Sequence, residues 1–325
     1  MIIDFNTAFN IYKSAFRIRS IEKRIANEYP NGEIRCPVHL SIGQEILSAV
    51  YSQIQTDVDT AISTHRSHAH YLGKGGDLYR MIAEIYGKVT GCCRGRGGSM
   101  HLVDPSCGFL GSSAIVGNSI PVGVGAAFAH KLKKDNGVTF IFLGDAATEE
   151  GVFYESVNFA VVQQLPAVFM CENNLYSVYT NLQPRQPSGR KITNLAKSLG
   201  ATVKNLNCND PIQMYSDLLF SVENTRQAGG PLFVEVQTYR WLEHCGPFDD
   251  DHLGYRPRGE LASAMLNDPI AILLEQLKSF NVNDLNEKLE KFYISLTNEI
   301  DEVFLKVKND PYPELDDVIS GVYAQ

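Results

Sequence analysis

Several features that define large classes of proteins are missing from this 325-residue sequence. It contains no apolar run long enough to cross a bilayer, for which a helix needs about 20 predominantly apolar residues. The start, Met1-Ile2-Ile3-Asp4, lacks the basic and apolar regions of a signal peptide, so we expect a cytoplasmic protein without a membrane role. Positive charge is in deficit, with 29 Lys and Arg against 37 Asp and Glu, and the net charge of -8 disfavours nucleic acids and anionic membranes as partners.

Cysteine is present without the patterns that give it a structural role. The seven cysteines are odd in number and scattered, which argues for reduced thiols rather than a disulfide framework. Cys92 and Cys93 are adjacent and no Cys-x-x-Cys occurs, which argues against a zinc site. A Walker-type phosphate loop is also absent. We expect most of the cysteines to be small buried apolar groups.

What is present is the composition of a soluble globular protein, 44% hydrophobic and 20% charged, with a length that suits one large domain or two ordinary ones. Short, continuous apolar runs predict strands that are buried on both faces, at residues 138–143, 167–171 and 232–236. Helical spacing is found at residues 5–28, 148–164 and 211–228. Strands and helices alternate, which predicts an α/β fold with a parallel sheet.

The chain changes character after Arg258. Asp268 followed by Pro269 is a helix-start signal, with Asp as the cap and Pro in the first turn. Apolar and charged residues then alternate with helical spacing up to Lys308. We therefore expect an α/β domain over residues 1–258 and a helical C-terminal extension over residues 259–325.

Polar residues directly follow two of the predicted strands. Gly144-Asp145-Ala146-Ala147 follows the first strand, and Asn173-Asn174 follows the second. Open α/β sheets bind ligands at the carboxyl ends of their strands, and the free N–H groups at the start of the next helix favour an anion such as diphosphate. Asp145 and Asn174 supply oxygen ligands of the kind that Mg²⁺ takes together with phosphate oxygens and water. Taken singly, these residues suit a helix cap and an ordinary turn; taken jointly, they favour a metal site.

These residues and further motifs together resemble one family. Gly-Asp-Gly followed at this distance by Asn-Asn is the signature of thiamine diphosphate enzymes, and this chain departs from it at Ala146, whose Cβ could crowd the diphosphate. Other motifs follow in the family's order, at His39–Glu45, Arg66–His68, Gly95–His101, Ile115–Gly117, Gln237–Arg240 and Asp268–Ile270. The sequence is thereby similar, over nearly its whole length, to the alpha subunit of the decarboxylating component of 2-oxo acid dehydrogenases (pyruvate, branched-chain or acetoin dehydrogenase).

The resemblance implies the thiamine diphosphate-binding fold and a set of cofactor contacts. The implied cofactor-binding residues are His39, His65, Arg66, Ala114, Val116, Asp145, Ala146, Ala147, Asn174 and His244. Arg66 is expected to contact the diphosphate, with His65 beside it where many relatives have tyrosine. Ala114 and Val116 match positions whose backbone meets the aminopyrimidine. Asp145 and Asn174 are expected to bind Mg²⁺ through their side chains, and Tyr176 through its carbonyl.

Histidines are the implied catalytic residues. His68 and His244 match histidines of the family's active site, as does His39, and imidazole can donate or accept protons near neutral pH. A structural or exposed histidine is the alternative, and it is strongest for His39. The other histidines are assigned no role: His70, His101, His130 and His252.

Two segments have less certain meanings. Glu243–Pro247 places Cys245 after the histidine, where many relatives have serine, so the substrate could differ from pyruvate. We interpret Asp249–Asp251, which follows, as a solvated acidic loop. Pro121–Ala127 is rich in small residues; close helix packing is favoured over a nucleotide-binding fingerprint because no strand is predicted before it.

The resemblance also implies partners and a reaction. A beta subunit is expected, in a heterotetramer of two alpha and two beta chains, and it supplies the glutamate that activates the aminopyrimidine. The implied reaction is decarboxylation of a small-molecule 2-oxo acid and transfer of the acyl group to a lipoyl-bearing acyltransferase. Two alternatives stay open. One is an acetoin-cleaving or carboligating enzyme with the same cofactor, and the other is a catalytically silent scaffold or regulatory subunit, suggested by Ala146.

Overall fold

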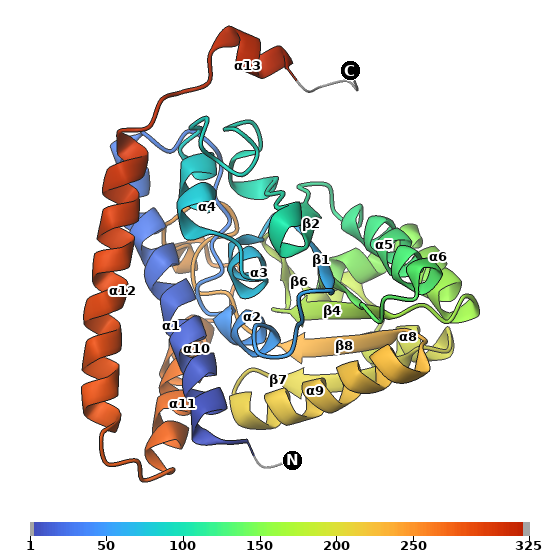
Figure 1. Ribbon diagram of the computed structural model, residues 1–325. Helices are drawn as coiled ribbons and strands as arrows, with labels where there is room; N and C mark the ends of the chain where they lie inside the picture. Colours follow the sequence, from blue (N-terminus) through green and yellow to red (C-terminus); the bar gives the residue numbers. More distant parts are fainter. Residues whose placement is uncertain (1–2, 321–325) are drawn as a thin grey trace.

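The computed structural model describes residues 3–320 and has a six-stranded parallel sheet at its centre (Figure 1). The strands lie in the order β2-β1-β3-β4-β8-β7, and every neighbouring pair is parallel. Their bounds are β1 Thr60–Ser63, β2 Phe109–Ser112, β3 Thr139–Gly144, β4 Ala167–Asn173, β7 Thr202–Asn207 and β8 Leu232–Gln237. A small antiparallel pair, β5 Tyr176–Ser177 and β6 Thr180–Asn181, follows β4. The predicted α/β fold with a parallel sheet is confirmed.

Helices surround the sheet. The first half of the chain forms α1 Phe5–Glu28, α2 Glu45–Tyr51, α3 His68–Gly73, α4 Leu78–Ile85, α5 Ser119–Lys133 and α6 Gly151–Val162. The second half forms α7 Leu182–Arg185, α8 Ile192–Ser198, α9 Pro211–Ala228, α10 Glu260–Leu266, α11 Pro269–Lys278, α12 Leu285–Lys308 and α13 Leu315–Ile319. Short 3-10 helices are η1 Tyr29–Asn31, η2 Gly98–Met100, η3 Pro105–Cys107, η4 Asp145–Glu149 and η5 Asp251–Leu253. Among the described residues, no helix is both long and apolar enough to span a membrane.

The side chains of the central strands alternate between two apolar layers, because successive residues of a strand point to opposite faces. In β3, Phe140 and Phe142 belong to one buried cluster, whereas Ile141 and Leu143 belong to the other. Helices α5, α6 and α8 contribute to the layer of Ile141, and helices α1, α2, α4, α9, α11 and α12 to the layer of Phe140. Both faces of the sheet are therefore buried, which explains the continuous apolar runs in the sequence.

The sequence predicts half of the sheet. β3, β4 and β8 match the three predicted apolar runs with small differences at their ends. β1, β2 and β7 were not predicted from the sequence. β1 and β2 have four residues each and include serine or glycine. β7 is an edge strand, and most of its polar side chains are exposed or half-buried. These three strands lack the continuous apolar run on which the prediction depended.

The helix after β3 begins later than predicted. The helical spacing predicts a start at residue 148, but α6 begins at Gly151, and residues Asp145–Glu149 form the 3-10 helix η4 instead. The hydroxyl of Thr148 donates to the carbonyl of Asp145 at 2.6 Å, which caps this short turn. Asp145 therefore heads a 3-10 turn and does not stand at the start of α6. The predicted helices at residues 5–28 and 211–228 are confirmed as α1 and α9.

The small residues of α5 allow it to lie close to the sheet. A Cβ at Gly123 would come within 2.5 Å of Ile141 Cγ1 and 2.8 Å of Ile62 Cγ2, so only glycine fits against β3 and β1 there. The interpretation of Pro121–Ala127 as a packing segment is confirmed. A strand, β2, does precede α5, contrary to the prediction that none would.

The first and the last long helices lie side by side (Figure 1). The hydroxyls of Tyr12 in α1 and Tyr293 in α12 are 2.6 Å apart, and Phe16 packs against Tyr293 with ring centroids 4.7 Å apart. Arg17 of α1 forms an ion pair of 2.6 Å with Glu299 of α12. Buried leucines and isoleucines of α11 and α12 belong to the same apolar cluster as α1. The C-terminal helices are thus present as predicted, with Asp268 capping α11, while the division at residue 258 stays a prediction.

All seven cysteines are free, as expected, but their burial differs from the prediction. Only Cys171 and Cys208 are buried, because they lie at the sheet and at its carboxyl edge. Cys245 is exposed, and the other four are partly exposed because they lie in connecting segments.

Candidate active site

A cavity of about 220 Å³ lies at the carboxyl edge of the sheet. Four neighbouring strands open onto it. Ala114 and Val116 follow β2, His65 and Arg66 follow β1, and the remaining residues follow β3 and β4: Asp145, Ala146, Ala147, Asn174 and Tyr176. His39 and His244 close the cavity from two loops that are joined to each other, since the Gly246 N–H donates to the Val38 carbonyl at 2.8 Å. The structure thus brings every predicted cofactor- and metal-binding residue to one cavity.

Arg66 is a buried cation without a carboxylate partner among the described residues. Only 6% of the residue is exposed, and its guanidinium donates to two backbone carbonyls, those of Leu40 at 2.6 Å and His244 at 3.0 Å. Burial, followed by the charge of Arg240, lowers the Arg66 pKa to about 9. A buried charge is stable only when it is paired, so Arg66 is suited to meet an anion in the cavity.

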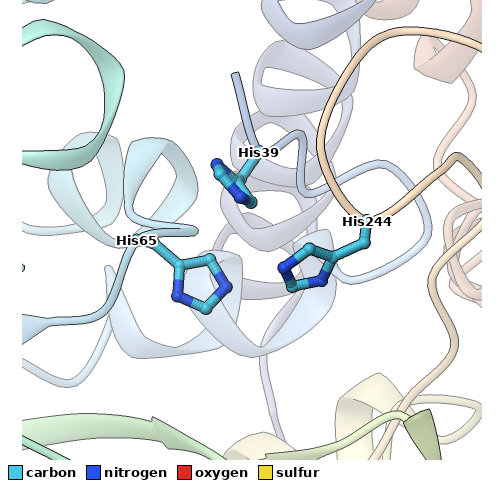
Figure 2. Close-up of side chains that lie close together, drawn as sticks. All are labelled: His39, His65 and His244. Atoms are coloured by element: carbon cyan, nitrogen blue, oxygen red, sulfur yellow. The ribbon is translucent and has the colours of Figure 1, made fainter. Parts of the chain in front are cut away.

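Three imidazole rings, those of His39, His65 and His244, converge at one wall of the cavity (Figure 2). The ring centroids are 4.7 to 5.3 Å apart. Burial first, and then the charge of Arg66, lowers the pKa of His39 to about 2, of His65 to about 4 and of His244 to about 3. All three rings are therefore neutral at pH 7 and can each donate or accept a hydrogen bond.

The cavity histidines differ from three other histidines in their hydrogen bonds. His68 contacts Glu22 at 3.0 Å and the hydroxyl of Ser99 at 2.8 Å. His70 and His130 likewise use both ring nitrogens, on Ser63 and Glu172 and on Thr60 and Asp135. Within residues 3–320, no side-chain hydrogen bond involves the rings of His39, His65 or His244, and His39 Nδ1 is buried without a partner. Their nitrogens are therefore available to a ligand.

His68 does not line the cavity. It is fully buried, and its two partners come from α1 and from the turn η2. Arg66 and Met100, which do line the cavity, are close in sequence to His68 and Ser99 respectively. The placement suits a residue that positions the cavity wall, and a direct role in catalysis is not supported by it.

The carboxylate of Asp145 is already in contact with a cation from the same chain. Arg185, at the end of α7, pairs with Asp145 and reaches Glu149 at 2.6 Å. Only 3% of the Asp145 side chain is exposed. Burial raises the Asp145 pKa, and the hydrogen bond from Arg185 opposes this shift. The site therefore holds a buried negative charge that a cation stabilises.

Asn174 and Tyr176 form a turn beside Asp145, because the register pairs Gly144 of β3 with Glu172 of β4. Asn174 Oδ1 accepts the Tyr176 N–H at 3.0 Å, and its amide donates to Gln44 at 3.2 Å. The Tyr176 hydroxyl donates to Glu260 at 2.6 Å, and Tyr176 also lines the cavity. Asp145 and Asn174 can thus present two oxygen ligands at one edge of the sheet.

Ala146 has an unstrained backbone, since it is not among the residues with a left-handed φ. It lines the cavity between Asp145 and Ala147. The absence of glycine therefore affects the space in the cavity and not the path of the chain.

Some residues of the cavity were missed in the sequence. Glu172 lines it and is held by His70 Nε2 at 3.1 Å; its place directly before Asn173-Asn174, at a strand end, was the available signal. Gln44 lies in a motif already singled out. Arg185 does not line the cavity itself but pairs with Asp145; it comes from α7, and no sequence pattern pointed to it.

The acidic loop after His244 is not fully solvated, contrary to the interpretation of Asp249–Asp251. Asp250 is 1% exposed and forms ion pairs with Arg240 at 3.5 Å and Arg256 at 3.2 Å. Arg240 lies ten positions before Asp250 and Arg256 six positions after it, so their convergence was not visible in the sequence. Asp250 therefore anchors the loop that carries His244.

Comparison with known proteins agrees with this geometry. Residues 13–316 match the family described as the dehydrogenase E1 component. The alpha subunit of the pyruvate dehydrogenase E1 component of Rickettsia bellii is 32% identical over 313 residues, covering 96% of this chain and 94% of that protein. The alpha subunit of acetoin:2,6-dichlorophenolindophenol oxidoreductase of Bacillus subtilis is 31% identical over 320 residues, covering 97% and 92%. The chain therefore belongs to the dehydrogenase E1 component family, and its prediction as an alpha-type subunit of a 2-oxo acid dehydrogenase, an oxidoreductase, is confirmed.

Proposed function

We propose that the cavity binds thiamine diphosphate with Mg²⁺ and that the chain uses it, with a beta subunit, to decarboxylate a 2-oxo acid. The family implies the cofactor. The observation that carries the assignment to this cavity is Arg66, a buried guanidinium without a carboxylate partner among the described residues, in the same cavity as the acid Asp145. An anion at Arg66 would satisfy its charge, and a divalent cation at Asp145 would take the place that Arg185 now holds.

The residues present fit the cofactor. Arg66 would hold the diphosphate, with Ala146 and Ala147 against it, and Asp145, Asn174 and the Tyr176 carbonyl would hold Mg²⁺. Ala114 and Val116 would meet the aminopyrimidine. When bound, thiamine diphosphate supplies a carbon nucleophile and stores the electron pair that is left by the loss of CO₂.

The chain's own histidines suit the proton transfers of such a reaction. His39 and His244 are neutral at pH 7 and have free nitrogens, so each can donate a proton to, or accept one from, a substrate oxygen. His65 adds a third such group. We assign His68 a positioning role, through Ser99 and the wall that carries Met100.

Exposed apolar side chains beside the cavity support the proposal that a partner subunit binds there. Ile115, Val116 and Tyr179 lie in segments that border it, and they are exposed by 66%, 53% and 48%. Contiguous exposed apolar groups mark interaction surfaces. The beta chain would cover them and supply the glutamate for the aminopyrimidine, since Glu172 is held by His70. The two-alpha, two-beta assembly, the lipoyl-bearing acyltransferase and the cytoplasmic location stay predictions.

A second candidate keeps the cofactor and changes the acceptor. The acetoin-linked relative is almost as similar as the pyruvate-linked one, at 31% against 32% identity. Cys245 is exposed next to His244, where many relatives were expected to have serine. Product analysis with and without a lipoyl domain separates the two candidates, because only acyl transfer to lipoyl requires that domain.

Calorimetry on the chain co-purified with its beta partner tests the proposal. We expect thiamine diphosphate to bind only with Mg²⁺ present, and Asp145→Ala to abolish this binding while the complex stays assembled. Unchanged thiamine diphosphate binding by Asp145→Ala would show that Asp145 is not a ligand of the metal. No binding by the wild-type complex would refute the cofactor assignment and favour the silent-scaffold alternative.

A further inference from the structure

We propose that, in the chain without bound thiamine diphosphate, His39, His65 and His244 form a binding site for one divalent transition-metal ion of the zinc class at the wall of the cavity, as an alternative to the cofactor-bound state in which their nitrogens face substrate. The three residues come from three separate segments of the chain, so no sequence motif announces them. The expectation against a zinc site depended on cysteine spacing alone. The site proposed here uses nitrogen ligands only, and it is distinct from the Mg²⁺ position at Asp145.

The geometry of the rings carries the proposal. One ring nitrogen from each histidine can be chosen so that all three lie within 4.8 Å of one another. Zinc–nitrogen bonds are about 2.0–2.1 Å, so ligand nitrogens in a tetrahedral site are roughly 3.4 Å apart. The ring nitrogens must therefore approach by up to about 1.4 Å, a shift within the reach of side-chain rotations. Figure 2 shows the rings already turned toward a common centre.

The hydrogen bonds support the proposal independently. His39 Nδ1 is buried and has no partner, which is a cost that a metal ion would remove. The neighbouring structural histidines, His68 and His70, have both nitrogens occupied.

The charges around the trio select the kind of ion. Arg66 repels any cation at this wall, which disfavours weakly bound Mg²⁺ or Ca²⁺. Glu172 in the same cavity offsets part of this repulsion, whereas Asp145 is already paired with Arg185. Imidazole binds zinc, copper and nickel ions much better than it binds hard cations. Three protein ligands leave a fourth position, which faces the cavity and is open to water or an anionic ligand.

Cobalt spectroscopy on the full chain, stripped of metal with a chelator, tests the site. We expect one Co²⁺ per chain with the visible bands of a tetrahedral ion, displaced by one equivalent of Zn²⁺. No thiolate-to-cobalt charge-transfer band should accompany them. Such a band would place the ion at the other cluster, Glu84 with Cys92 and Cys93, and would overturn the proposal. The absence of stoichiometric binding would overturn it as well.

Two variants sharpen the result. His65→Tyr and His244→Gln should each weaken Zn²⁺ binding by at least about tenfold, because loss of even an outer-shell partner costs about that much. His252→Gln removes an exposed histidine in η5 and should leave the affinity unchanged. Equal affinity in His65→Tyr and wild type would overturn the assignment. If a variant fails to fold by circular dichroism, the wild-type cobalt spectrum still decides.

The metal site and the proposed function fail separately. A chain that binds Zn²⁺ at the trio but never binds thiamine diphosphate with its beta partner would refute the proposed function and leave this inference standing. Cofactor binding by a chain without a cobalt spectrum of nitrogen ligands would refute the metal site alone.

Discussion

Arg185 lies against Asp145 and joins it to Glu149, so a side chain of the same chain occupies the cation position that the strand-end acid offers. The guanidinium is only 11% exposed, and its Nε–H also donates to the Asn181 carbonyl at 3.3 Å. A metal ion that approaches Asp145 therefore meets a positive charge that is already in place. The proposed Mg²⁺ at Asp145 would therefore require Arg185 to withdraw from the carboxylate.

Removal of this charge should strengthen Mg²⁺ binding. In Arg185→Gln, the Mg²⁺ concentration for half-maximal thiamine diphosphate binding is expected to fall by about tenfold, equivalent to about 1.4 kcal/mol, because the competing cation is gone. Calorimetry at a series of Mg²⁺ concentrations measures it on the complex with the beta chain. Arg190→Gln, which removes an exposed arginine, is the matched control and should behave like wild type. A higher Mg²⁺ requirement in Arg185→Gln would show that Arg185 orients Asp145 for the metal.

Two buried arginines should respond in opposite ways to the same change. Arg66 lacks a carboxylate partner among the described residues, so Arg66→Gln should leave the thermal stability of the cofactor-free chain unchanged or raised. Arg19 pairs with buried Glu45 and with Asp268, so Arg19→Gln should cost about 3–5 kcal/mol of unfolding free energy.

The affinity for thiamine diphosphate, unlike stability, should depend on Arg66. Arg66→Gln is expected to weaken thiamine diphosphate binding by at least about tenfold, or about 1.4 kcal/mol, through loss of a charge-assisted contact. Chemical denaturation and calorimetry measure the two quantities. A large loss of stability in Arg66→Gln without a loss of cofactor affinity would contradict the role of Arg66.

Ala146 should limit the space for the cofactor only slightly. Ala146→Gly restores the family's glycine, and we expect its affinity for thiamine diphosphate to rise by less than about tenfold, while the chain loses about 0.5–1 kcal/mol of stability from added backbone freedom. Ala146→Leu fills the cavity and should prevent binding. Normal binding by the leucine variant would show that the diphosphate lies elsewhere.

The cavity histidines make the fold sensitive to acid. Their folded pKa values, from about 2 to about 4, are below the ordinary value of 6.5. Below pH 6.5 the unfolded chain therefore binds protons that the folded chain does not, and stability falls as the pH falls toward 4. Each group contributes up to about 1.4 kcal/mol per pH unit. The free energy of unfolding, measured with urea, should accordingly fall less steeply between pH 6.5 and 4 in His65→Tyr than in wild type. Parallel curves would refute the assignment of this pKa.

His68 and His244 should separate stability from activity. His68→Ala removes two buried hydrogen bonds and is expected to cost about 2–4 kcal/mol of unfolding free energy, with turnover of the folded complex reduced by less than about tenfold. His244→Ala removes a ring without hydrogen bonds, so stability should change by less than about 1 kcal/mol while turnover falls by about 100-fold or more. Denaturation and turnover assays with the beta chain measure both. If His68→Ala stays stable but loses most of its turnover, His68 takes a direct part in catalysis after all.

The central strands of the sheet, and the site residues that directly follow them, could be predicted from the sequence. β3, β4 and β8 are buried on both faces, which forces a continuous apolar run that is visible in one dimension. Asp145 and Asn174 follow such runs, so their meeting at one edge could be inferred. β7 lies at the edge of the sheet, where polar residues such as Lys204 and Asn205 are tolerated, and its sequence has no such signal.

Contacts between distant segments could not be predicted from the sequence. The pair of Arg185 and Asp145 depends on how the chain returns after β6, and the pair of His68 and Glu22 depends on how α1 packs against α3. The family resemblance assigned histidines and acidic residues to the active site, but it did not indicate which side chains they pair with. Asp250 was misread for the same reason, since its two arginines are brought to it by the fold alone.

The pairing of α1 with α12 has a consequence for how the protein is made. The apolar face of α1, with Tyr12 and Phe16, finds its partner Tyr293 only after the long intervening stretch of chain has been synthesised. Contacts between residues so far apart in sequence slow folding and leave apolar surface uncovered meanwhile. Nascent chains that stall before α12 should therefore expose this apolar face and recruit chaperones.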